Sequence, residues 1–183
     1  RKEGKKQVNV LVATSGDTGS AVANGFLGVE GIHVYVLYPK GKVSEIQEKQ
    51  FTTLGQNITA LEIDGTFDDC QALVKSAFMD KELNEHLQLT SANSINVARF
   101  LPQAFYYFYA YAQLKKLGKA NDAVICVPSG NFGNITAGLF GKRMGLPVKR
   151  FIAANNRNDI FYQYLQTGVY TPRPSIATIA NAM

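Results

Sequence analysis

Two short glycine-containing segments could do chemistry, because each follows an apolar run and precedes a helix-like stretch. They are residues 14–19, which read TSGDTG, and residues 129–134, which read SGNFGN. Glycines let backbone N–H groups approach a ligand closely, and the amino terminus of a helix favours an anion. Each segment therefore indicates a turn for a phosphate or a carboxylate, and a tight strand-to-helix turn without a ligand is the alternative.

Neither segment matches a common nucleotide-binding motif. No Gly-Lys-Ser/Thr follows either one, as a P-loop requires, and neither reads G-x-G-x-x-G, the dinucleotide fingerprint. The two histidines, His33 and His86, lack metal-ligand spacing, and no G-x-S-x-G nucleophile motif occurs. The chemistry that remains is an anionic small molecule held by backbone amides and short polar side chains, without a metal.

The charge of the chain argues against a nucleic-acid partner. The formal net charge is +5, but four of the cations fall within residues 1–6. No basic face is interleaved with aromatic residues that could stack on bases. A small anionic substrate fits this modest surplus better, and a solvated surface explains it equally well.

The composition is typical of a folded soluble domain. The chain has 183 residues, of which 46% are hydrophobic and 18% charged, and this excludes disorder. No apolar run reaches the roughly 18–20 residues of a membrane span, and the first residues lack the pattern of a signal peptide. We therefore expect a cytoplasmic protein with no membrane partner, in which Cys70 and Cys126 are reduced core thiols.

Strand-like and helix-like stretches alternate along the chain. Strands are predicted at residues 8–13, 33–38, 58–64, 123–127 and 148–154. Helices are predicted at residues 20–27, 45–54, 68–79, 96–117, 134–144 and 159–166, with a loop around 89–94. Ser44 and Gln47 have the spacing of a capping box for the second helix, and Pro102 is either a first-turn residue or a kink.

This alternation predicts an α/β fold with an open, mostly parallel twisted sheet and helices on both faces. Parallel strands need crossover connections, which the helices supply. Ligands of such sheets bind beyond the carboxyl ends of the strands. Both glycine segments lie at such ends, after the first and the fourth predicted strand.

Three motifs in this order resemble the threonine synthase family, which comprises pyridoxal-phosphate (PLP) enzymes of fold type II, the tryptophan-synthase-β superfamily. They are TSGDTG at 14–19, NSIN at 93–96 with Arg99, and GNFGN at 130–134. The likeness runs through essentially the whole chain and includes PKGKVS at 39–44 and RPSIA at 173–177. It implies a lyase of amino-acid biosynthesis that converts O-phospho-L-homoserine and water to L-threonine and phosphate, with pyridoxal 5′-phosphate as its cofactor.

Two other functions are compatible with these motifs. A related phospho-lyase would release phosphate and 2-oxobutyrate without adding water. A non-catalytic module could use the same α/β scaffold to bind phosphate or another ligand.

The resemblance implies two groups of binding residues. The cofactor is expected to be held by Asp17, Gly130, Asn131, Phe132, Gly133 and Asn134, the last five around its 5′-phosphate. The substrate is expected to be bound by Ser15, Gly16, Thr18, Asn93, Ser94 and Arg99. By the resemblance, Ser15, Gly16 and Thr18 bind the α-carboxylate of the substrate. The substrate phosphate is expected to be bound by Asn93, Ser94 and Arg99, and Thr18 also lies near it. For Arg99 the alternative is a solvated helix residue, and for Asn93 and Ser94 it is a helix cap.

Asp17 departs from the wider superfamily, in which many members have Asn at this position. By resemblance it contacts the 3′-oxygen of the pyridine ring. A carboxylate beside a phenolate oxygen is repulsive unless a proton or a cation lies between them. The hydrogen-bonding role of Asp17 therefore needs its own explanation.

The resemblance also predicts that the chain is a fragment. The family's Schiff-base lysine lies in a Phe-Lys-Asp segment upstream of TSGDTG, and the chain contains no such segment. We expect an internal fragment of a longer enzyme that is inactive alone. Residues 1 to about 120 would be the smaller α/β region and residues 121–183 the start of the large PLP-binding region. The aromatic residues of the helix at 96–117 would be mostly core, with some on a surface that the remaining chain or a second subunit buries, as in a homo-oligomer.

Overall fold

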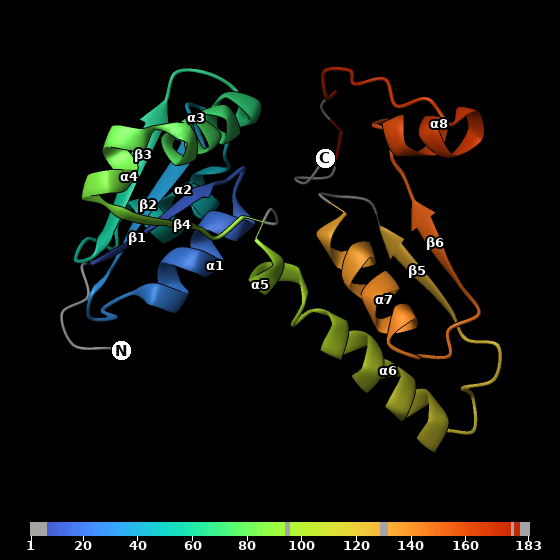
Figure 1. Cartoon of the computed structure of the whole chain (residues 1–183). Helices are drawn as coiled ribbons and strands as arrows, with labels where there is room; N and C mark the ends of the chain where they lie inside the picture. Colours follow the sequence, from blue (N-terminus) through green and yellow to red (C-terminus); the bar gives the residue numbers. More distant parts are fainter. Residues whose placement is uncertain (1–6, 94–95, 129–131, 177, 180–183) are drawn as a thin grey trace. The chain divides into compact units, whose positions relative to one another are not determined.

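The computed structural model describes residues 7–93, 96–128, 132–176 and 178–179. The chain divides into two compact units, Arg1–Asn96 and Val97–Met183, and each is described by itself (Figure 1). The division falls after Asn96. The boundary expected near residue 120 refers to the regions of a complete enzyme and stays a prediction.

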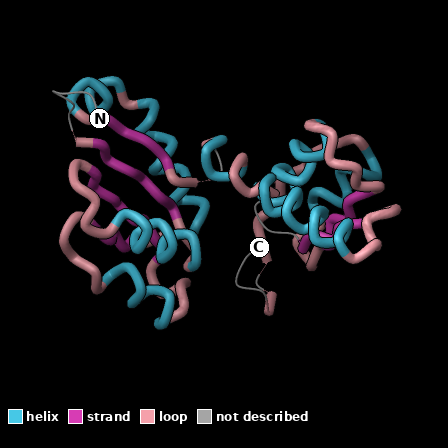
Figure 2. The backbone as a smooth tube through the Cα atoms, turned by 90° about the horizontal axis from the view of Figure 1, so that it is seen from below, coloured by secondary structure: helices cyan, strands magenta, loops and turns pink. Residues whose placement is uncertain are grey.

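The first unit is a parallel four-stranded sheet with helical connections. Its strands are β1 (Val8–Ala13), β2 (Ile32–Pro39), β3 (Ile58–Ile63) and β4 (Gln88–Ser91), in the order β3-β2-β1-β4. Its helices are α1 (Asp17–Phe26), α2 (Glu45–Thr52), α3 (Phe67–Met79) and α4 (Lys81–His86). Figure 2 shows helices on both sides of these strands.

Both faces of this sheet carry buried side chains. Successive side chains of a strand point to opposite faces, so one strand can contribute to the core on each side. On β1, Val10 and Val12 belong to the core formed with α1 and α2. Leu11 and Ala13 pack instead in the core around Cys70 of α3. The apolar, β-branched sequence of β1 thus serves two cores, as expected for a central parallel strand.

The described residues of the second unit form two parallel strands and four helices. The strands are β5 (Val124–Pro128) and β6 (Arg150–Ala154). The helices are α5 (Val97–Phe100), α6 (Ala104–Lys116), α7 (Gly133–Arg143) and α8 (Ile160–Thr167). Tyr107 of α6, Ala137 of α7 and Val127 of β5 belong to one buried core. These helices therefore cover one face of the two strands.

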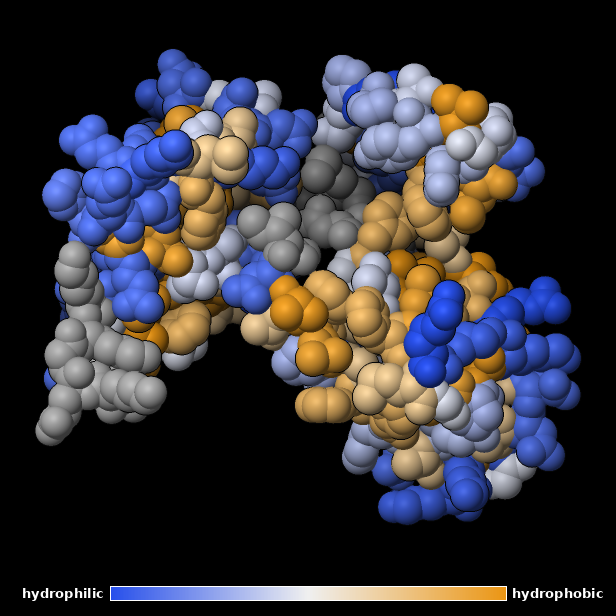
Figure 3. All heavy atoms as spheres, viewed as in Figure 1, coloured by the Kyte–Doolittle hydropathy of each residue, from blue (hydrophilic) through white to orange (hydrophobic). Residues whose placement is uncertain are grey.

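Apolar side chains reach the surface of the second unit (Figure 3). Of the aromatic residues predicted on one long helix, four pack in the core, namely Phe100, Tyr107, Phe108 and Tyr111. Phe105, Tyr106 and Tyr109 are 62%, 71% and 70% exposed. The helix therefore carries aromatic residues on two faces.

The structure confirms the predicted α/β class with parallel strands. The strands form two sheets, however, and the fourth strand of the first sheet, β4, lies where a loop was predicted. The short helix α4, capped by Asp80, was not predicted. The helix predicted over 96–117 is interrupted, because Pro102 has no N–H to continue the helical bonds and sits in the turn between α5 and α6.

The two cysteines differ in burial. Cys70 is buried, and this burial raises the pKa of its thiol. Cys126 is exposed, so the prediction that both are core thiols is wrong for this residue. Cys126 pairs in register with Ile152, which is 47% exposed, so both lie on the uncovered face of the strands. Among the described residues, no helix is long and apolar enough to cross a membrane.

Candidate functional site

The first glycine turn is shaped by one buried hydroxyl group. Thr14 follows β1, and its Oγ1 accepts hydrogen bonds from the N–H groups of Gly16 at 2.9 Å and Gly19 at 2.8 Å. The N–H of Thr14 donates to the carbonyl oxygen of Leu37 at 2.9 Å, so sheet bonding continues one residue beyond the strand. The turn therefore starts at the carboxyl edge of the sheet, as predicted for a ligand-binding edge.

Both glycines of this turn are required by contacts inside the unit. Gly16 has φ 147° and ψ −91°, a conformation that side chains disfavour. A Cβ at Gly16 would lie 2.5 Å from Oε1 of Gln47, and a Cβ at Gly19 would lie 2.5 Å from Cγ2 of Thr14. Packing alone thus explains these glycines, and a ligand is an additional role for the same turn.

Asp17 is held by a residue that the sequence did not mark as part of the site. Asp17 is exposed at the start of α1, and its Oδ1 accepts a hydrogen bond from Nε2 of Gln47. Oε1 of Gln47 in turn accepts a hydrogen bond from Oγ of Ser44 at 2.8 Å. Helix α2 begins after Ser44 as predicted, but the predicted capping box is wrong, because the Ser44 side chain makes no cap hydrogen bond.

The other predicted residues of this turn lie beside Asp17. Ser15 is exposed, whereas Thr18, the second residue of α1, is half-buried. The first N–H groups of a helix have no acceptor within the helix. Short hydroxyl side chains next to free N–H groups form a suitable surface for a carboxylate.

Asn93 ties the segment after β4 to the end of β1. Its Oδ1 accepts a hydrogen bond from the N–H of Ala13 at 2.9 Å, and its Nδ2 donates to the carbonyl oxygen of Ala13 at 2.7 Å. Asn93 therefore lies next to the first glycine turn, and one N–H of its amide is not used by Ala13. The amide bonds to a strand and not to a helix terminus, unlike a helix cap. Ser94 lies outside the described residues.

The second glycine turn joins β5 to α7. Gly130 and Asn131 lie outside the described residues. Phe132 adopts the left-handed conformation, with φ 55°, and precedes Gly133, the first residue of α7. The N–H of Thr136 makes a helical bond to the carbonyl oxygen of Phe132 at 2.9 Å. The N–H groups of the three preceding residues thus have no acceptor within the helix and can meet an anion.

Asn134 is oriented by a tyrosine that the sequence interpretation missed. The hydroxyl of Tyr107 lies 2.9 Å from the carbonyl oxygen of Asn134 and 2.5 Å from its Oδ1, and both oxygens are acceptors. Burial raises the pKa of Tyr107, which keeps the hydroxyl protonated as a donor. Tyr107 is 27 residues away in sequence, and only its place in a run of aromatic residues pointed to a core position.

Arg99 has an unsatisfied buried nitrogen. The residue is half-buried in α5, and its Nε is buried with no hydrogen-bond partner in the part of the chain that the structure describes. A buried donor without a partner is costly, more so on a charged group. This is not the environment of a fully solvated side chain, and it suits an arginine that meets an anion.

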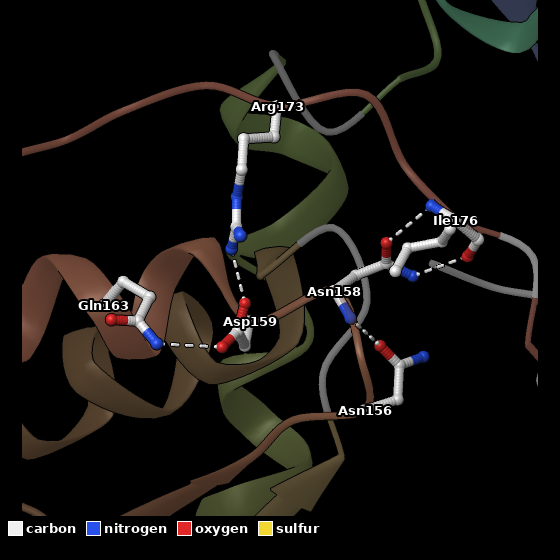
Figure 4. Close-up of polar contacts among 6 residues, drawn as sticks. All are labelled: Asn156, Asn158, Asp159, Gln163, Arg173 and Ile176. Atoms are coloured by element: carbon white, nitrogen blue, oxygen red, sulfur yellow. Dashed lines mark hydrogen bonds and ion pairs between the residues drawn. The ribbon is translucent and has the colours of Figure 1, made fainter.

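The carboxyl-terminal residues are held by a polar network (Figure 4). Asp159 accepts hydrogen bonds from Gln163 Nε2 at 2.9 Å and Arg173 Nη2 at 2.5 Å, and these bonds lower its pKa. Asn158 bonds both backbone groups of Ile176, donating at 3.0 Å and accepting at 2.8 Å. A cavity of about 450 Å³ lies beside the network and is lined by Ile160, Gln163, Thr167, Val169, Thr171 and Arg173. These contacts anchor residues of the RPSIA motif.

Comparison with known proteins identifies the family. The family model of the pyridoxal-phosphate dependent enzymes matches residues 1–183. The chain belongs to this family of pyridoxal-phosphate dependent enzymes. Pyridoxal 5′-phosphate is therefore its cofactor, as the resemblance predicted.

Among the members of this family, threonine synthases are similar to the chain. Those of Haemophilus influenzae and Escherichia coli are 55% and 56% identical over 180 residues, which are 98% of this chain and 42% of either relative. The threonine synthase of Saccharomyces cerevisiae is 46% identical over 181 residues, 98% of this chain and 35% of the relative. The predicted resemblance is confirmed, and the chain spans about two fifths of the length of the first two relatives.

Solved structures of the pyridoxal-phosphate dependent enzymes show the same fold. The crystal structure of Escherichia coli threonine synthase matches with a TM-score of 0.90 and 54% identity, over 97% of this chain and 41% of that one. The PLP-bound threonine synthase of Brucella melitensis matches with a TM-score of 0.79 and 43% identity, over 94% and 37%. Maize serine racemase, at 19% identity and a TM-score of 0.68 over 94% of this chain and 48% of that one, shares the fold.

The two units divide the predicted site residues of this family member between them. The first unit brings Asn93 next to the turn of Ser15, Gly16, Asp17 and Thr18. The second unit contains Arg99, Phe132, Gly133 and Asn134. The roles of these residues toward cofactor and substrate stay predictions.

Proposed function

We propose that this chain is part of a threonine synthase, an enzyme that converts O-phospho-L-homoserine and water to L-threonine and inorganic phosphate. The observation that carries the proposal is the 55% identity to a threonine synthase over 98% of the chain. That span includes all three motifs from which the resemblance was drawn. The cytoplasmic location and a homo-oligomeric assembly, both expected above, stay proposals.

The second glycine turn suits the phosphate of PLP. The free N–H groups at the start of α7 provide donors, and Phe132 turns the chain sharply into that helix. We assign the five residues of this turn to the cofactor phosphate, namely Gly130, Asn131, Phe132, Gly133 and Asn134. Tyr107 holds Asn134 in place through its hydroxyl. When bound, PLP supplies an electron sink that stabilises charge as protons leave the substrate.

The first glycine turn suits the α-carboxylate of the substrate. Ser15 and Thr18 offer hydroxyl groups and backbone N–H groups near the start of α1, and Gly16 between them, whose own N–H bonds Oγ1 of Thr14, lets the ligand approach the backbone closely. Asp17 is assigned to the side of the pyridine ring that carries the 3′-oxygen. The turn orients the substrate, because Thr14 and Gln47 hold its shape before any ligand binds.

The phosphate of the substrate is assigned to Asn93, Ser94 and Arg99. Arg99 supports this role because its buried Nε lacks a partner among the described residues. A guanidinium group binds phosphate through two parallel hydrogen bonds, which give both charge and orientation. Asn93 contributes the N–H that Ala13 leaves unused.

Product analysis of the complete enzyme tests the proposed function. The enzyme is incubated with PLP and O-phospho-L-homoserine, and phosphate, threonine and 2-oxobutyrate are measured. We expect threonine and phosphate in equal amounts. Phosphate with 2-oxobutyrate would assign the phospho-lyase reaction instead, and a PLP-loaded protein that releases no phosphate would exclude both.

We further propose that the 183-residue chain alone is inactive. The support is that it contains no Phe-Lys-Asp segment, which holds the catalytic lysine in the family. The chain is incubated with PLP and treated with borohydride, which fixes the cofactor on any lysine that holds it. We expect only scattered labelling of exposed amines, and stoichiometric labelling of one lysine would contradict the proposal.

A further inference from the structure

A chain of hydrogen bonds leads from α2 to the first glycine turn. Oγ of Ser44 donates to Oε1 of Gln47 at 2.8 Å, and Nε2 of Gln47 donates to Oδ1 of Asp17. An ionised carboxylate only accepts hydrogen bonds, so the amide N–H must face Asp17 and the amide oxygen must face Ser44. The Asp17 carboxylate therefore determines the orientation of the Gln47 amide, and the Ser44 hydroxyl, which can donate, fits that orientation.

Gln47 also contacts the turn itself. Its side chain lies over Gly16, where a Cβ would come within 2.5 Å of Oε1. Its backbone carbonyl accepts a hydrogen bond from Oγ of Ser20 at 3.3 Å, and the same hydroxyl lies 3.2 Å from the carbonyl oxygen of Gly16. Gln47 thus contacts the chain on both sides of Asp17, at Gly16 of the turn and at Ser20 of α1.

These contacts take the place of the hydrogen bonds that the Gln47 side chain would make in a capping box of α2. Ser44 and Gln47 have the spacing of a capping box, in which each would bond the backbone of α2. The structure instead directs the Gln47 amide across 30 residues of sequence to Asp17. Ordering a glutamine side chain costs conformational entropy. In this structure the ordered side chain orients the Asp17 carboxylate.

We propose that Gln47 is a positioning residue that holds one oxygen of the Asp17 carboxylate and thereby presents the other oxygen to the ligand of the first glycine turn. This inference rests on the proposed function, in which Asp17 faces the 3′-oxygen of PLP. Two negatively charged oxygens in proximity repel each other. The Gln47 bond keeps the carboxylate from turning into solvent, so that one defined oxygen faces the ring.

The experiment compares variants of the complete PLP-loaded enzyme. Gln47→Met keeps the length of the side chain over Gly16 but removes the N–H donor. Gln50→Met is the matched control, because it makes the same substitution on an exposed residue of the same helix. The measurements are the visible absorption spectrum of the bound cofactor against pH, kcat, KM and the melting temperature.

We expect Gln47→Met to change the spectrum of the bound cofactor and the pH at which that spectrum changes. We expect kcat to fall about ten- to a hundredfold, as for the loss of one hydrogen bond to a charged group, while KM changes by less than about twofold. Gln50→Met should match the unaltered enzyme in every measurement. In an Asp17→Asn background, Gln47→Met should have a smaller effect, since the two side chains act as a pair.

The inference is overturned if Gln47→Met has the spectrum and kcat of the unaltered enzyme, including when only its melting temperature falls. Ser44→Ala removes the outer hydroxyl and decides the question if Gln47→Met does not fold. A smaller spectral change in the same direction supports the inference, and an unchanged spectrum overturns it. The proposed function fails separately, if the unaltered enzyme binds no PLP or does not convert O-phospho-L-homoserine.

Discussion

The two glycine turns follow parallel strands and precede helices, yet they are stabilised in different ways. In the first unit, Thr14 contacts both glycines of the turn, Gln47 contacts Gly16, and Asp17 has a partner within the same unit. In the second unit, the first N–H groups of α7 have no acceptor within the helix, and Arg99 has a buried Nε without a partner among the described residues. The shape of the first turn is held by residues of its own unit without a ligand. The unit that contains the second turn has hydrogen-bond donors for which no protein acceptor is described.

This difference indicates where a ligand should matter most. A turn held by its own unit contributes a fixed geometry, and its substitution should affect folding. A unit with unpaired buried donors should lose binding and catalysis when those donors are removed, with less effect on folding. The following predictions test this contrast.

The largest effect is expected for Arg99→Ala in the complete enzyme. If Arg99 binds the substrate phosphate, kcat/KM for O-phospho-L-homoserine should fall by about ten- to several hundredfold. PLP occupancy should stay unchanged, because the cofactor phosphate is assigned to a different set of residues. Steady-state kinetics and the cofactor content after dialysis are the measurements.

Arg99→Lys is the matched control for charge. A lysine keeps the positive charge but not the planar, two-pronged donor, so it should restore only part of the activity. Unaltered kinetics in Arg99→Ala would remove Arg99 from the site. Loss of PLP together with activity would place it on the cofactor phosphate.

A substitution in the first turn should act on stability. In Gly16→Ala the new Cβ would meet Gln47 at 2.5 Å, in a backbone conformation that alanine disfavours. We expect a loss of roughly 2 kcal/mol or more in the free energy of unfolding. Denaturant unfolding of the complete enzyme measures it.

Gly25→Ala, in the helix α1 that Gly16 precedes, provides the control. A Cβ at Gly25 of α1 meets no atom within 4 Å. Helix propensity then favours alanine by about 0.5–1 kcal/mol, so this variant should be as stable as the unaltered protein or more so. If Gly16→Ala is as stable as Gly25→Ala, then neither the Gln47 contact nor the backbone conformation constrains the turn.

The sequence predicted the fold class and the central strand better than the short elements and the ends of the helices. The run of β-branched residues at 8–13 identified β1, because a strand buried on both faces has no polar alternation. The four residues of β4 lack such a run, and β4 became recognisable as a strand only through its pairing with β1. The pattern of aromatic residues continued across Pro102, so one helix was predicted where there are two.

The sequence predicted individual residues of the candidate site, but it did not predict the residues that hydrogen-bond to them. Motifs identified Asp17 and Asn134, whereas their hydrogen-bond partners Gln47 and Tyr107 lie 30 and 27 residues away. Periodicity indicates which face of a helix is buried. It does not indicate which side chains meet across two elements, and so Gln47 was assigned to a cap that the structure does not form.

A smaller effect is expected at the second turn for Tyr107→Phe. This change removes the hydroxyl that holds Asn134 but keeps the buried ring, so the free energy of unfolding should fall by about 1 kcal/mol. PLP affinity should fall with it if Asn134 binds the cofactor phosphate. Tyr109→Phe, on a residue that is 70% exposed, should stay within about 0.5 kcal/mol of the unaltered enzyme. An unchanged PLP affinity in Tyr107→Phe would show that this tyrosine serves the core alone.

The smallest effect is expected at two carboxylates, one in each unit, of which Asp69 is exposed and Asp159 half-buried. The pKa of Asp69 is lowered by the backbone N–H and the hydroxyl of Thr66, within the capping box of α3. The pKa of Asp159 is lowered by the amide of Gln163 and then by Arg173. Because both folded-state values lie below the ordinary value of about 3.9, each carboxylate stabilises the fold above that pH. This stabilisation is lost as the pH falls through the folded-state pKa.

Added salt should affect the stabilisation by Asp69 and the stabilisation by Asp159 to different extents. Arg173 is charged, so added salt should weaken its contribution at Asp159, whereas the main partners of Asp69 are uncharged groups of Thr66. Melting temperatures of Asp69→Asn and Asp159→Asn, measured from neutral pH down to about pH 2 at low and high salt, test this difference. Each variant should lose part of the pH dependence in acid, and the part removed by Asp159→Asn should shrink more with salt than the part removed by Asp69→Asn, whose charged neighbour Lys42 is the smallest cause of its shift. If both parts shrink equally with salt, then the capping box depends on charge as much as the Asp159–Arg173 pair does, and the contrast between the two units does not extend to their surfaces.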